Sequence, residues 1–569
     1  MTEAVDPAAV WAAAREALSG LPGDGLNIAQ EAAVRHVEEG NGERVAVRHI
    51  AADGVVTEVT YAELEAQSAR FAVALARLGV APGEPVAWIG GRRPELFPVL
   101  LGTVRTRAVL CPLFAAFGPE PLATRLRLAR VRVAVTTEAV LRRLTAVRDR
   151  LPDLHHVIVF DGAANDGDAL SFRTVMASAS GVYPIPETSA DDPALLHFTS
   201  GTTGAPKGVI HVHEAVVAHR HTAAEALGLR AGDVFWCTAD PGWVTGISYG
   251  VIAPLTIGAT VLQDSGDFDS QRWVDILERE QVNVWYTSPT ALRMMRRLGS
   301  ELGEGRDFGA LRVAASVGEP LDAASVNWGR ETLGLPIRDT WWQTETGAIM
   351  VANSPVAGVK AGAMGKPLPG VESAVVSRVD DGPLTFLDGD DIKGELAFRA
   401  NWPSLFRGYL DQPERYAASF RDGWYLSGDL VRRDAEGWLH FVGRGDDLIK
   451  CAGHLIGPTE VEQVLLTHPV VADAAVVGLP DEITGERVHA YVVLLDGVKA
   501  NEATRRALIA HARSRLGPAV APRSVEFRRN LPHTRSGKIL RRVLRAETLG
   551  ESVGDMSTVE DSNERSEES

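Results

Sequence analysis

The segment at residues 199–208 carries the side chains best suited to binding phosphate. It reads Thr-Ser-Gly-Thr-Thr-Gly-Ala-Pro-Lys-Gly, with three glycines, four hydroxyl groups and one ammonium group. Glycines let successive backbone N–H groups turn into one concavity, an arrangement that binds anions. The segment is not a Walker A loop, because Gly208 follows Lys207 where that motif has Ser or Thr. These residue types predict a polyphosphate ligand.

The residues before this segment favour the phosphate interpretation over a plain surface loop, which such a composition also fits. The apolar run Ala-Leu-Leu-His-Phe at 194–198 leads directly into it. A buried strand followed by a glycine-rich turn is how many phosphate sites are built.

A second cluster, Asp-Thr-Trp-Trp-Gln-Thr-Glu-Thr-Gly at 339–347, combines aromatic and acidic side chains. Adjacent residues of an extended segment point to opposite sides, so one tryptophan can pack in the core while the other lines a cavity. The alternative is that both tryptophans are core residues. Glu345 offers an oxygen ligand to a hard cation such as magnesium, which accompanies nucleotide polyphosphates.

Two further short segments contain single charged residues beside glycine. Asp429 follows Gly428 and could accept hydrogen bonds from both hydroxyls of a ribose. Lys538 follows Gly537 in a segment expected to be a loop, with Arg541 and Arg542 close behind. Taken singly, the first is more often a simple turn and the second a solvated charge.

Composition limits the class of protein. The chain has 569 residues, a length that implies several domains. Its formal net charge of −16 argues against general nucleic-acid binding. The amino terminus lacks a basic-then-apolar signal, and the most apolar run, 96–117, is interrupted by two arginines. Three widely spaced cysteines form no metal or disulfide framework. We therefore expect a cytoplasmic protein without membrane association.

The elements that must position these residues alternate between short apolar runs and helical patterns, which predicts an α/β fold of parallel sheets covered by helices. The expected helices include 61–78 and 270–280. From about residue 365, shorter strands between Gly, Pro and Asp turns predict an antiparallel or β-barrel-like section. The expected strands are Pro85–Ile89, 155–160, 195–199, 259–263, 282–286 and 312–316.

A domain boundary is expected near Gly-Arg-Gly-Asp-Asp at 443–447. The division is then a large N-terminal domain at 1–445, a small mobile α+β C-terminal domain at 446–549, and a disordered acidic tail at 550–569. Within the small domain, helices are expected at 458–468 and 504–516 and strands at 470–478 and 488–495.

Together, and in this order, the motifs resemble the superfamily of AMP-forming acyl-CoA synthetases, adenylation domains and firefly luciferase. The resemblance spans about residues 26–549. Within the superfamily the chain is most similar to the acetyl-coenzyme A synthetases. The segments that carry this refinement are Asp-Pro-Gly-Trp-Val-Thr-Gly at 240–246, Tyr-Thr-Ser-Pro-Thr-Ala at 286–291, Ser-Val-Gly-Glu-Pro at 316–320 and the 339–347 cluster.

The resemblance implies a site for ATP, Mg²⁺ and coenzyme A. Magnesium would bind to Glu345, and Asp429 and Arg444 would hold the ribose hydroxyls. The remaining nucleotide contacts fall in three groups: around the phosphates Thr199, Ser200, Gly201, Thr202, Thr203 and Lys207; beside the adenine Gly318, Glu319 and Pro320; and along the adenylate Asp339, Thr340, Trp341, Trp342, Gln343 and Thr344.

The resemblance also gives the small domain a role. Lys538 matches the catalytic lysine, which contacts the carboxylate and the α-phosphate and is a target of a lysine acetyltransferase and deacetylase in the family. Asp446 matches the hinge about which the domain rotates between half-reactions. Thr245 and Arg513 match positions that contact coenzyme A, and His468 matches one associated with a second, structural cation.

The acyl pocket implied by the resemblance is small. Its walls would be Val244, Thr245, Val317 and Trp342, and the indole leaves room for a methyl group or barely an ethyl group. Because one methylene changes binding in such a pocket by only ~1–3 kcal/mol, we expect acetate to be preferred and propionate tolerated.

The chain departs from the resemblance at two positions. Leu455 replaces an arginine that reaches the nucleotide phosphates, and Ala452 replaces a serine near coenzyme A, while Lys450 could supply compensating charge. The leading hypothesis is an acetate–CoA ligase that forms AMP and diphosphate. The alternatives are a ligase for propionate or another short acid, a non-catalytic acyl-adenylate binding protein, and an adenylation domain serving a carrier protein.

Overall fold

The computed structural model describes residues 6–162, 169–200, 206–378, 382–445, 447–451, 454–481, 484–495, 497–518, 520–534 and 539–553, without the side chains of Ser200, Arg378, His454 and Leu455. Gly201, Thr202, Thr203, Asp446 and Lys538 therefore lie outside the described residues, as does most of the expected tail. Among the helices of these ranges, none combines the length and the apolar character needed to cross a lipid bilayer.

The first large sheet has nine strands and is parallel through its centre. Its order is β16 (Lys366–Pro367), β15 (Val351–Ala352), β14 (Ile337–Trp341), β13 (Val313–Ser316), β12 (Val284–Thr287), β10 (Val234–Cys237), β11 (Thr260–Asp264), β1 (Val45–Ile50) and β2 (Val56–Thr60). The central strands β12 and β13 are buried along their whole length and mainly apolar, as expected of strands covered on both faces.

The second large sheet has eight strands. Its order is β20 (Gly408–Tyr409), β9 (Pro206–Val212), β8 (Pro193–Ser200), β4 (Val109–Pro112), β3 (Pro85–Ile89), β5 (Val133–Thr136), β6 (His156–Val159) and β7 (Ala169–Ser171). The strands from β8 to β7 run parallel, whereas β9 and β20 are antiparallel additions at one edge.

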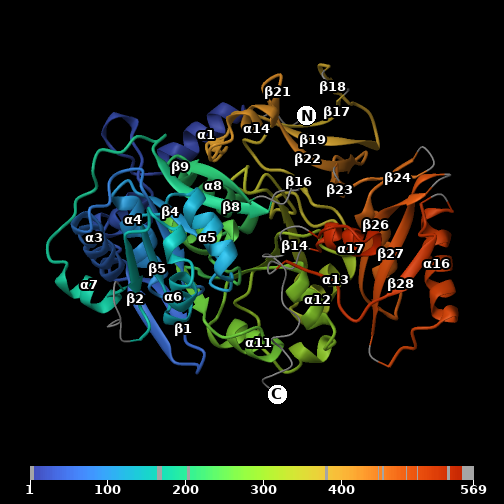
Figure 1. The fold of residues 1–569 in the computed structure, drawn as a ribbon, viewed down its shortest axis with the longest axis horizontal. Helices are drawn as coiled ribbons and strands as arrows, with labels where there is room; N and C mark the ends of the chain where they lie inside the picture. The colour runs from blue at the N-terminus through green and yellow to red at the C-terminus, as the bar shows by residue number, and fades with distance from the viewer. Residues whose placement is uncertain are drawn as a thin grey trace.

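Helices pack around these sheets in the blue to green part of the chain (Figure 1). Several begin with side-chain caps, such as the Thr60–Glu63 capping box of α3 and the Asp269 cap of α11. They are α1 (Pro7–Glu16), α2 (Arg35–Glu38), α3 (Tyr61–Arg77), α4 (Leu96–Arg105), α5 (Pro119–Leu128), α6 (Glu138–Thr145), α7 (Phe172–Ser178), α8 (Ala215–Leu227), α9 (Val244–Ile247), α10 (Ala253–Ile257), α11 (Ser270–Arg279), α12 (Pro289–Arg296) and α13 (Ala323–Thr332).

A third sheet is antiparallel and follows the two large sheets in the chain. Its six strands are β17 (Ser373–Arg378), β18 (Leu384–Phe386), β19 (Ile392–Arg399), β21 (Phe420–Arg421), β22 (Trp424–Arg433) and β23 (Leu439–Arg444), with α14 (Pro413–Ala418) before β21. This confirms the antiparallel section expected after residue 365.

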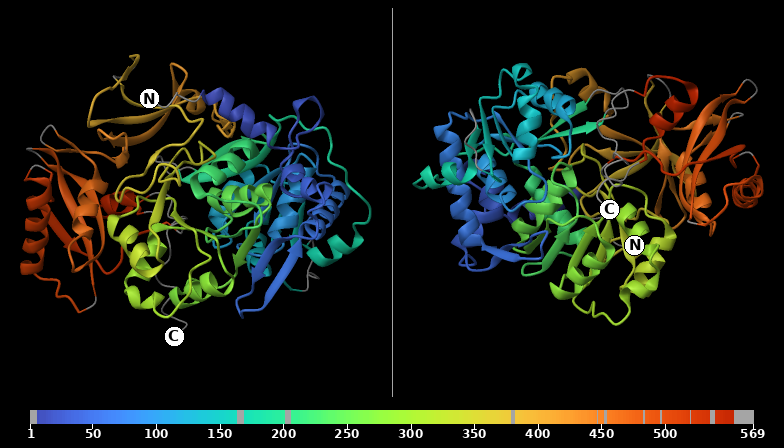
Figure 2. Two further views of the ribbon diagram at one scale, coloured as in Figure 1. Left: turned by 180° about the vertical axis from the view of Figure 1, so that it is seen from behind. Right: turned by 60° about the horizontal axis from the view of Figure 1, so that its bottom comes forward.

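The carboxyl-terminal part folds around its own sheet at one end of the molecule, orange to red in Figures 1 and 2. Its strands are β24 (Ile449–Cys451), β25 (His454–Ile456), β26 (Val471–Asp481), β27 (Gly485–Leu494) and β28 (Ser524–Phe527), and its helices are α15 (Pro458–Leu466), α16 (Glu502–Leu516) and α17 (Arg541–Leu549). A side chain after α12 bridges to this part, because Arg297 donates to the carbonyl of Ala472 at 3.2 Å.

The α/β fold class expected from the sequence is confirmed, and the expected strands and helices all occur within a few residues of their expected bounds. The structure adds that the carboxyl ends of β8, β13 and β14 meet at one place. Crevices at the carboxyl ends of parallel strands are where open α/β sheets bind ligands.

Candidate functional site

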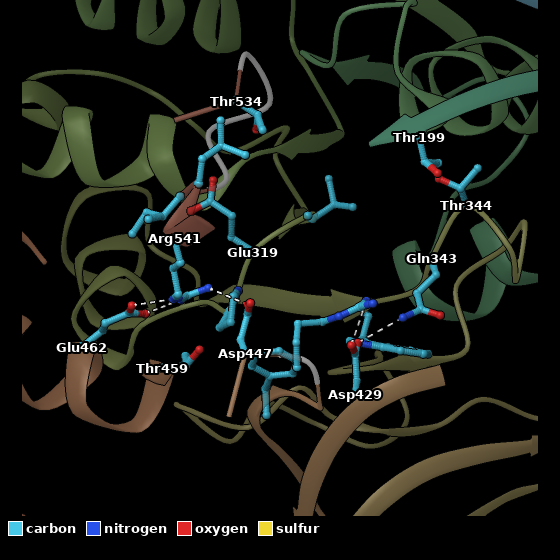
Figure 3. Close-up of a pocket in the computed structure, with 18 of the residues that line it drawn as sticks. Thr199, Glu319, Gln343, Thr344, Asp429, Asp447, Thr459, Glu462, Thr534 and Arg541 are labelled. Atoms are coloured by element: carbon cyan, nitrogen blue, oxygen red, sulfur yellow. Dashed lines mark hydrogen bonds and ion pairs between the residues drawn. The ribbon is translucent and has the colours of Figure 1, made fainter. Parts of the chain in front are cut away.

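A pocket of about 600 Å³ lies where the large sheets meet the carboxyl-terminal part. One wall comes from the carboxyl ends of β8, β13 and β14 and from β22 and β23. The opposite wall includes Asp447, Thr459, Glu462, Thr534 and Arg541 of the carboxyl-terminal part (Figure 3). Most of the predicted nucleotide residues that the structure describes therefore line one cavity.

The described part of the predicted phosphate segment lies at one end of this pocket. Thr199 near the end of β8 is directly paired with Lys207 of β9, and both side chains line the cavity. Thr344 comes close to Thr199 in the close-up (Figure 3). The Lys207 ammonium lies 5.6 Å from the centre of the Tyr409 ring, so the aromatic face supports the cation.

The turn at 343–347 is held by side chains from three distant segments. His211 Nε2 bonds the Thr344 carbonyl at 2.7 Å, and His219 Nε2 bonds the Gly347 carbonyl at 3.0 Å. Trp402 Nε1 and the Ser404 hydroxyl both donate to the Thr346 carbonyl, at 2.9 and 2.7 Å. These bonds fix the backbone that carries Glu345.

Glu345 is partly exposed and lines the pocket, as predicted for a cation ligand. Its Oε1 accepts a hydrogen bond from the Tyr409 hydroxyl at 2.8 Å, and its carbonyl accepts one from the Phe406 amide at 3.1 Å. The carboxylate is therefore oriented and retains further acceptor capacity.

The predicted adenine residues form the turn after β13. Gly318 has φ +98° and could not be replaced, because a Cβ there would lie 2.4 Å from the Trp243 ring. Glu319 accepts from the Thr290 hydroxyl at 2.7 Å and pairs with Arg293 at 2.5 Å. The Glu319 carboxylate is thus neutralised within the wall rather than facing a nucleotide unpaired.

Asp429 and Arg444 face each other across β22 and β23. Arg444 Nη1 lies 3.1 Å from Asp429 Oδ1, while Oδ2 accepts from Trp341 Nε1 at 2.9 Å and from Gln343 Nε2 at 3.2 Å (Figure 3). Tyr425 donates to Gln343 Oε1 at 2.8 Å and so fixes the amide orientation. Residues predicted separately from two motifs are here one hydrogen-bonded group.

Trp341 and Trp342 point in different directions, as predicted, although both line the pocket. Trp341 stacks on Phe398 with ring centres 5.3 Å apart and belongs to the core beside the third sheet. Trp342 packs edge-on against Tyr249 at 5.1 Å and donates to the Tyr286 hydroxyl at 3.2 Å.

The predicted acyl walls share one pocket with Trp342, and Val317 also belongs to the apolar cluster against which Trp342 packs. Val244, Thr245 and Val317 are buried and line the same cavity. Thr245 Oγ1 is buried without a hydrogen-bond partner among the described residues, so a polar group of a bound ligand could satisfy it.

Asp339 is 5% exposed and its carboxyl group accepts bonds from the Ser316 hydroxyl at 3.2 Å and the Leu321 amide at 3.3 Å. Burial raises the pKa of this carboxyl to about 8, because desolvation outweighs these hydrogen bonds. Asp339 is therefore mainly protonated near neutral pH.

Some predicted residues do not join this group. Arg513 on α16 is exposed and does not line the pocket. His468 after α15 does not line it either, and its ring packs edge-on against that of His511 with ring centres 4.9 Å apart. The described ranges contain no group of three or more His, Cys, Asp or Glu side chains that could hold a metal ion by themselves. Lys450 is exposed and lies away from the lining.

Sequence reasoning missed Arg293 and a charged cluster around Arg541 (Figure 3). The Arg541 guanidinium lies 2.5 Å from the Glu462 carboxylate and 3.4 Å from the Asp447 carboxylate. Burial alone would lower the pKa of Arg541, but the two carboxylates raise it and keep the guanidinium charged. No motif marks these residues, because they are ordinary helix and loop charges. They line a pocket only where the two parts of the chain meet. The basic run that follows Lys538 was the one available signal.

Family models match most of the chain. The AMP-binding enzyme model covers residues 34–410, and the model of the AMP-binding enzyme C-terminal domain covers residues 460–538. The division between the two models agrees with the change from the antiparallel sheet to the carboxyl-terminal sheet.

Individual relatives match over nearly their whole length. The acetyl-coenzyme A synthetase of Bacillus subtilis is 39% identical over 97% of this chain and 96% of its own, and that of Deinococcus radiodurans is 38% identical over 95% and 86%. Among solved structures, a Brucella canis acyl-CoA synthetase has 35% identity and a TM-score of 0.72, with 95% of this chain and 97% of its own covered.

A second solved structure, the anthranilate CoA ligase AuaEII with anthranoyl-AMP, has 26% identity and a TM-score of 0.82, with 92% of this chain and 97% of its own covered. The matched models, the full-length relatives and the pocket at the carboxyl ends of the strands agree. The chain belongs to the family of AMP-binding enzymes, as an AMP-forming acid–thiol ligase that uses ATP and coenzyme A.

Proposed function

We propose that this enzyme ligates acetate to coenzyme A, with AMP and diphosphate as the other products. The observation that carries the choice of acid is the indole of Trp342, which lines the pocket beside three small buried walls. Relatives at 38–39% identity that are named acetyl-coenzyme A synthetase support the same choice.

In the first half-reaction, an acetate oxygen attacks the α-phosphorus of ATP and the bond to diphosphate breaks. The reaction brings two anions together, so positioning and positive charge supply most of the catalysis. We assign the phosphates to Thr199, the segment after it, and Lys207, and the charge at the reacting centre to Lys538. Acetylation of Lys538 by a lysine acetyltransferase would remove that charge, and a deacetylase would restore it.

We assign the nucleotide sugar to Asp429 and Arg444, and the adenine to the turn at 318–320. Asp429 Oδ1 already pairs with the Arg444 guanidinium, and Oδ2 accepts from Trp341 and Gln343, which orients the carboxylate before a ribose arrives. Pre-orientation of this kind lowers the entropy lost on binding.

Glu345 fits a magnesium ion that is shared with the phosphates. Mg²⁺ usually takes one or two carboxylates and completes its shell with phosphate oxygens and water, and Glu345 supplies one oriented carboxylate beside Thr199 and Thr344. When bound, magnesium neutralises charge on the departing diphosphate. The structural cation near His468 remains a prediction from the resemblance.

In the second half-reaction, the thiol of coenzyme A attacks the acyl carbon of the adenylate and AMP leaves. We assign Thr245 and Arg513 to coenzyme A, with a domain rotation at Asp446 that brings the exposed Arg513 into use. The small domain at 446–549 would then present a different face to the same pocket.

The proposal is tested by diphosphate release from ATP with acetate, propionate and butyrate, with and without coenzyme A. We expect the highest kcat/KM with acetate, and acetyl-CoA formation that requires the thiol. A higher kcat/KM with propionate would identify another short-acid ligase. Adenylate formation with no thiol product would favour a carrier-protein partner, and no diphosphate release with any acid would favour a binding protein.

Replacement of Trp342 by glycine tests the acyl pocket itself. Removing the indole opens the cavity beyond the methyl position, so Trp342→Gly should shift preference toward butyrate, by a factor on the order of 10 or more per accommodated methylene. The measurement is kcat/KM for each acid in parent and variant. An unchanged ratio of butyrate to acetate in a folded variant would contradict the pocket assignment.

A further inference from the structure

The indole of Trp342 is connected by a chain of hydrogen bonds to the backbone next to Val317, another predicted wall of the proposed acyl pocket. Trp342 Nε1 lies 3.2 Å from the Tyr286 hydroxyl, which lies 2.7 Å from Thr340 Oγ1. Thr340 Oγ1 lies 2.7 Å from the carbonyl oxygen of Ser316. Ser316 directly precedes Val317, another wall of the same pocket.

The chemistry of its two ends fixes the direction of this chain. An indole nitrogen can only donate and a carbonyl oxygen can only accept. Trp342 therefore donates to Tyr286, the Tyr286 hydroxyl donates to Thr340, and the Thr340 hydroxyl donates to Ser316. Each hydroxyl therefore gives one hydrogen bond and receives one within the chain.

The chain is buried. Tyr286 is 0% exposed and Thr340 is 4% exposed, so water does not replace a lost member without entering the core. The indole itself is only partly buried, and its free edge forms the pocket wall. Its orientation thus depends on the one polar bond at its nitrogen and on the edge contact with Tyr249.

We propose that Tyr286 is a specificity-determining residue, whose hydroxyl holds the Trp342 indole across the acyl pocket and so limits the chain length of the acid. The residue acts through Trp342 and positions it. The inference rests on the proposed function, because it assumes that Trp342 closes the acyl pocket.

Tyr249 provides a matched control within the same cluster. Its hydroxyl accepts from the Ile349 amide at 2.7 Å and bonds Thr222 Oγ1 at 2.6 Å, and Thr222 donates to the Ala218 carbonyl at 2.7 Å. This second chain is equally buried and its ring touches the same indole, but its hydroxyl does not bond the indole nitrogen. Tyr286→Phe and Tyr249→Phe each remove one buried hydroxyl beside Trp342.

The experiment compares kcat/KM for acetate, propionate and butyrate in the parent, Tyr286→Phe and Tyr249→Phe. We expect the ratio of kcat/KM for propionate to that for acetate to rise about threefold to tenfold in Tyr286→Phe. This is less than the ~10- to 200-fold discrimination that one methylene gives in a rigid pocket, because the indole is loosened and not removed. In Tyr249→Phe the ratio should remain that of the parent. Equal ratios in all three proteins, or an equal rise in both variants, would overturn the inference.

A second pair of variants covers the case in which Tyr286→Phe fails to fold. Thr340→Val breaks the chain at its next member with little change of volume, and Thr340→Ser retains the hydroxyl. We expect the propionate-to-acetate ratio to rise in Thr340→Val and to return toward the parent value in Thr340→Ser. A rise of equal size in both would assign the effect to altered packing at position 340 and not to the loss of the hydroxyl, and would overturn the inference.

The outcome with Trp342→Gly separates failure of the inference from failure of the proposed function. If Trp342→Gly widens the acid range and Tyr286→Phe does not, the pocket assignment stands and the positioning role of Tyr286 falls. If neither variant changes the range, the acyl pocket itself is elsewhere.

Discussion

Asp339 begins the predicted adenylate segment and behaves unlike a surface acid. Its side chain is buried in the middle of β14, where burial raises its pKa to about 8. The motif identified the residue but gave no indication of its protonation state. That state is set by burial in the folded sheet, against which the hydrogen bonds from Leu321 and Ser316 act.

Asp339 should make the protein less stable as pH rises. The native carboxyl keeps its proton up to about pH 8, whereas the unfolded chain loses it near the ordinary value of 3.8, so between these values unfolding releases a proton. The unfolding free energy should fall across this window, by up to ~1.4 kcal/mol per pH unit from this group. Asp339→Asn, which cannot ionise, should show a flatter dependence.

The measurement is urea unfolding of the parent and Asp339→Asn at pH 5, 6, 7 and 8. The difference in unfolding free energy should shift steadily in favour of the variant as pH rises. Parallel curves for the two proteins would show that Asp339 is already ionised in the native state.

At the scale of elements, the turn at 343–347 depends on histidines that no pattern connected to it. His211 lies on β9 and His219 on α8, and both are buried with pKa values lowered by burial, in His211 to about 4 and in His219 to about 3. They are therefore neutral at pH 7. Since a carbonyl can only accept, the nitrogen that bonds it carries the proton, and Nε2 of each ring is the donor.

Replacement of His211 by leucine should weaken the use of magnesium more than the use of the acid. The Thr344 carbonyl would lose its buried donor, and the neighbouring Glu345 would lose its fixed position. We expect the Mg²⁺ concentration for half-maximal ATP–diphosphate exchange to rise several-fold, with a smaller change in the KM for acetate. His211→Gln, whose amide can donate from a similar position, should recover part of the loss.

A similar rise in every KM, without recovery in His211→Gln, would instead indicate a general loss of packing. The half-buried His221, on the same helix as His219, offers a control, because its ring bonds the Pro369 carbonyl at 3.2 Å and packs edge-on against Trp11 at 5.0 Å, and among the described residues it makes no hydrogen bond to the 343–347 turn. His221→Leu should leave the magnesium dependence unchanged.

Local patterns predicted the elements better than the contacts between them. β3 was predicted at its observed bounds, because a short apolar run between turn residues has few other solutions. The pairing of β9 with β20 was not predictable, since Val209 and Tyr409 are 200 residues apart in the chain. That pairing brings Tyr409 to Lys207 and Glu345, so an aromatic residue of the site had no local signal.

At the scale of the whole molecule, the pocket is complete only while the carboxyl-terminal part faces the two large sheets. Arg297 donates to the Ala472 carbonyl across this junction, and Thr534 and Arg541 line the same cavity as Asp339 and Asp429. The motifs predicted both sides of the site. They could not predict which side chains join the two parts, because such contacts depend on the relative placement of domains.

Loss of the Arg297 side chain should change the rates of the two half-reactions differently. The contact stabilises the arrangement in which the carboxyl-terminal part faces the pocket, and a typical hydrogen bond contributes about 0.5–1.5 kcal/mol. Arg297→Ala should slow adenylate formation about twofold to tenfold by that difference. Thioester formation from preformed acetyl-adenylate should be unchanged or faster, because the proposed domain rotation gives this step a different arrangement.

Rapid-mixing assays of the two half-reactions test this expectation. Arg330→Ala removes an arginine that bonds Asn327 within its own helix and should alter neither step. An equal loss in both half-reactions of Arg297→Ala would mean that the contact supports the fold and not one arrangement of it.

The opposed orientations of the two adjacent tryptophans have a consequence for how this enzyme can change over evolutionary time. Trp341 bonds the carboxylate of Asp429, while Trp342 reaches the tyrosine cluster on the other side. If Trp342 closes the acyl pocket as proposed, a mutation at position 342 would alter which acid is accepted while the contact of Trp341 with Asp429 stays intact. Single replacements of Trp342 would then give access to new acid substrates without passing through variants that have lost ATP binding.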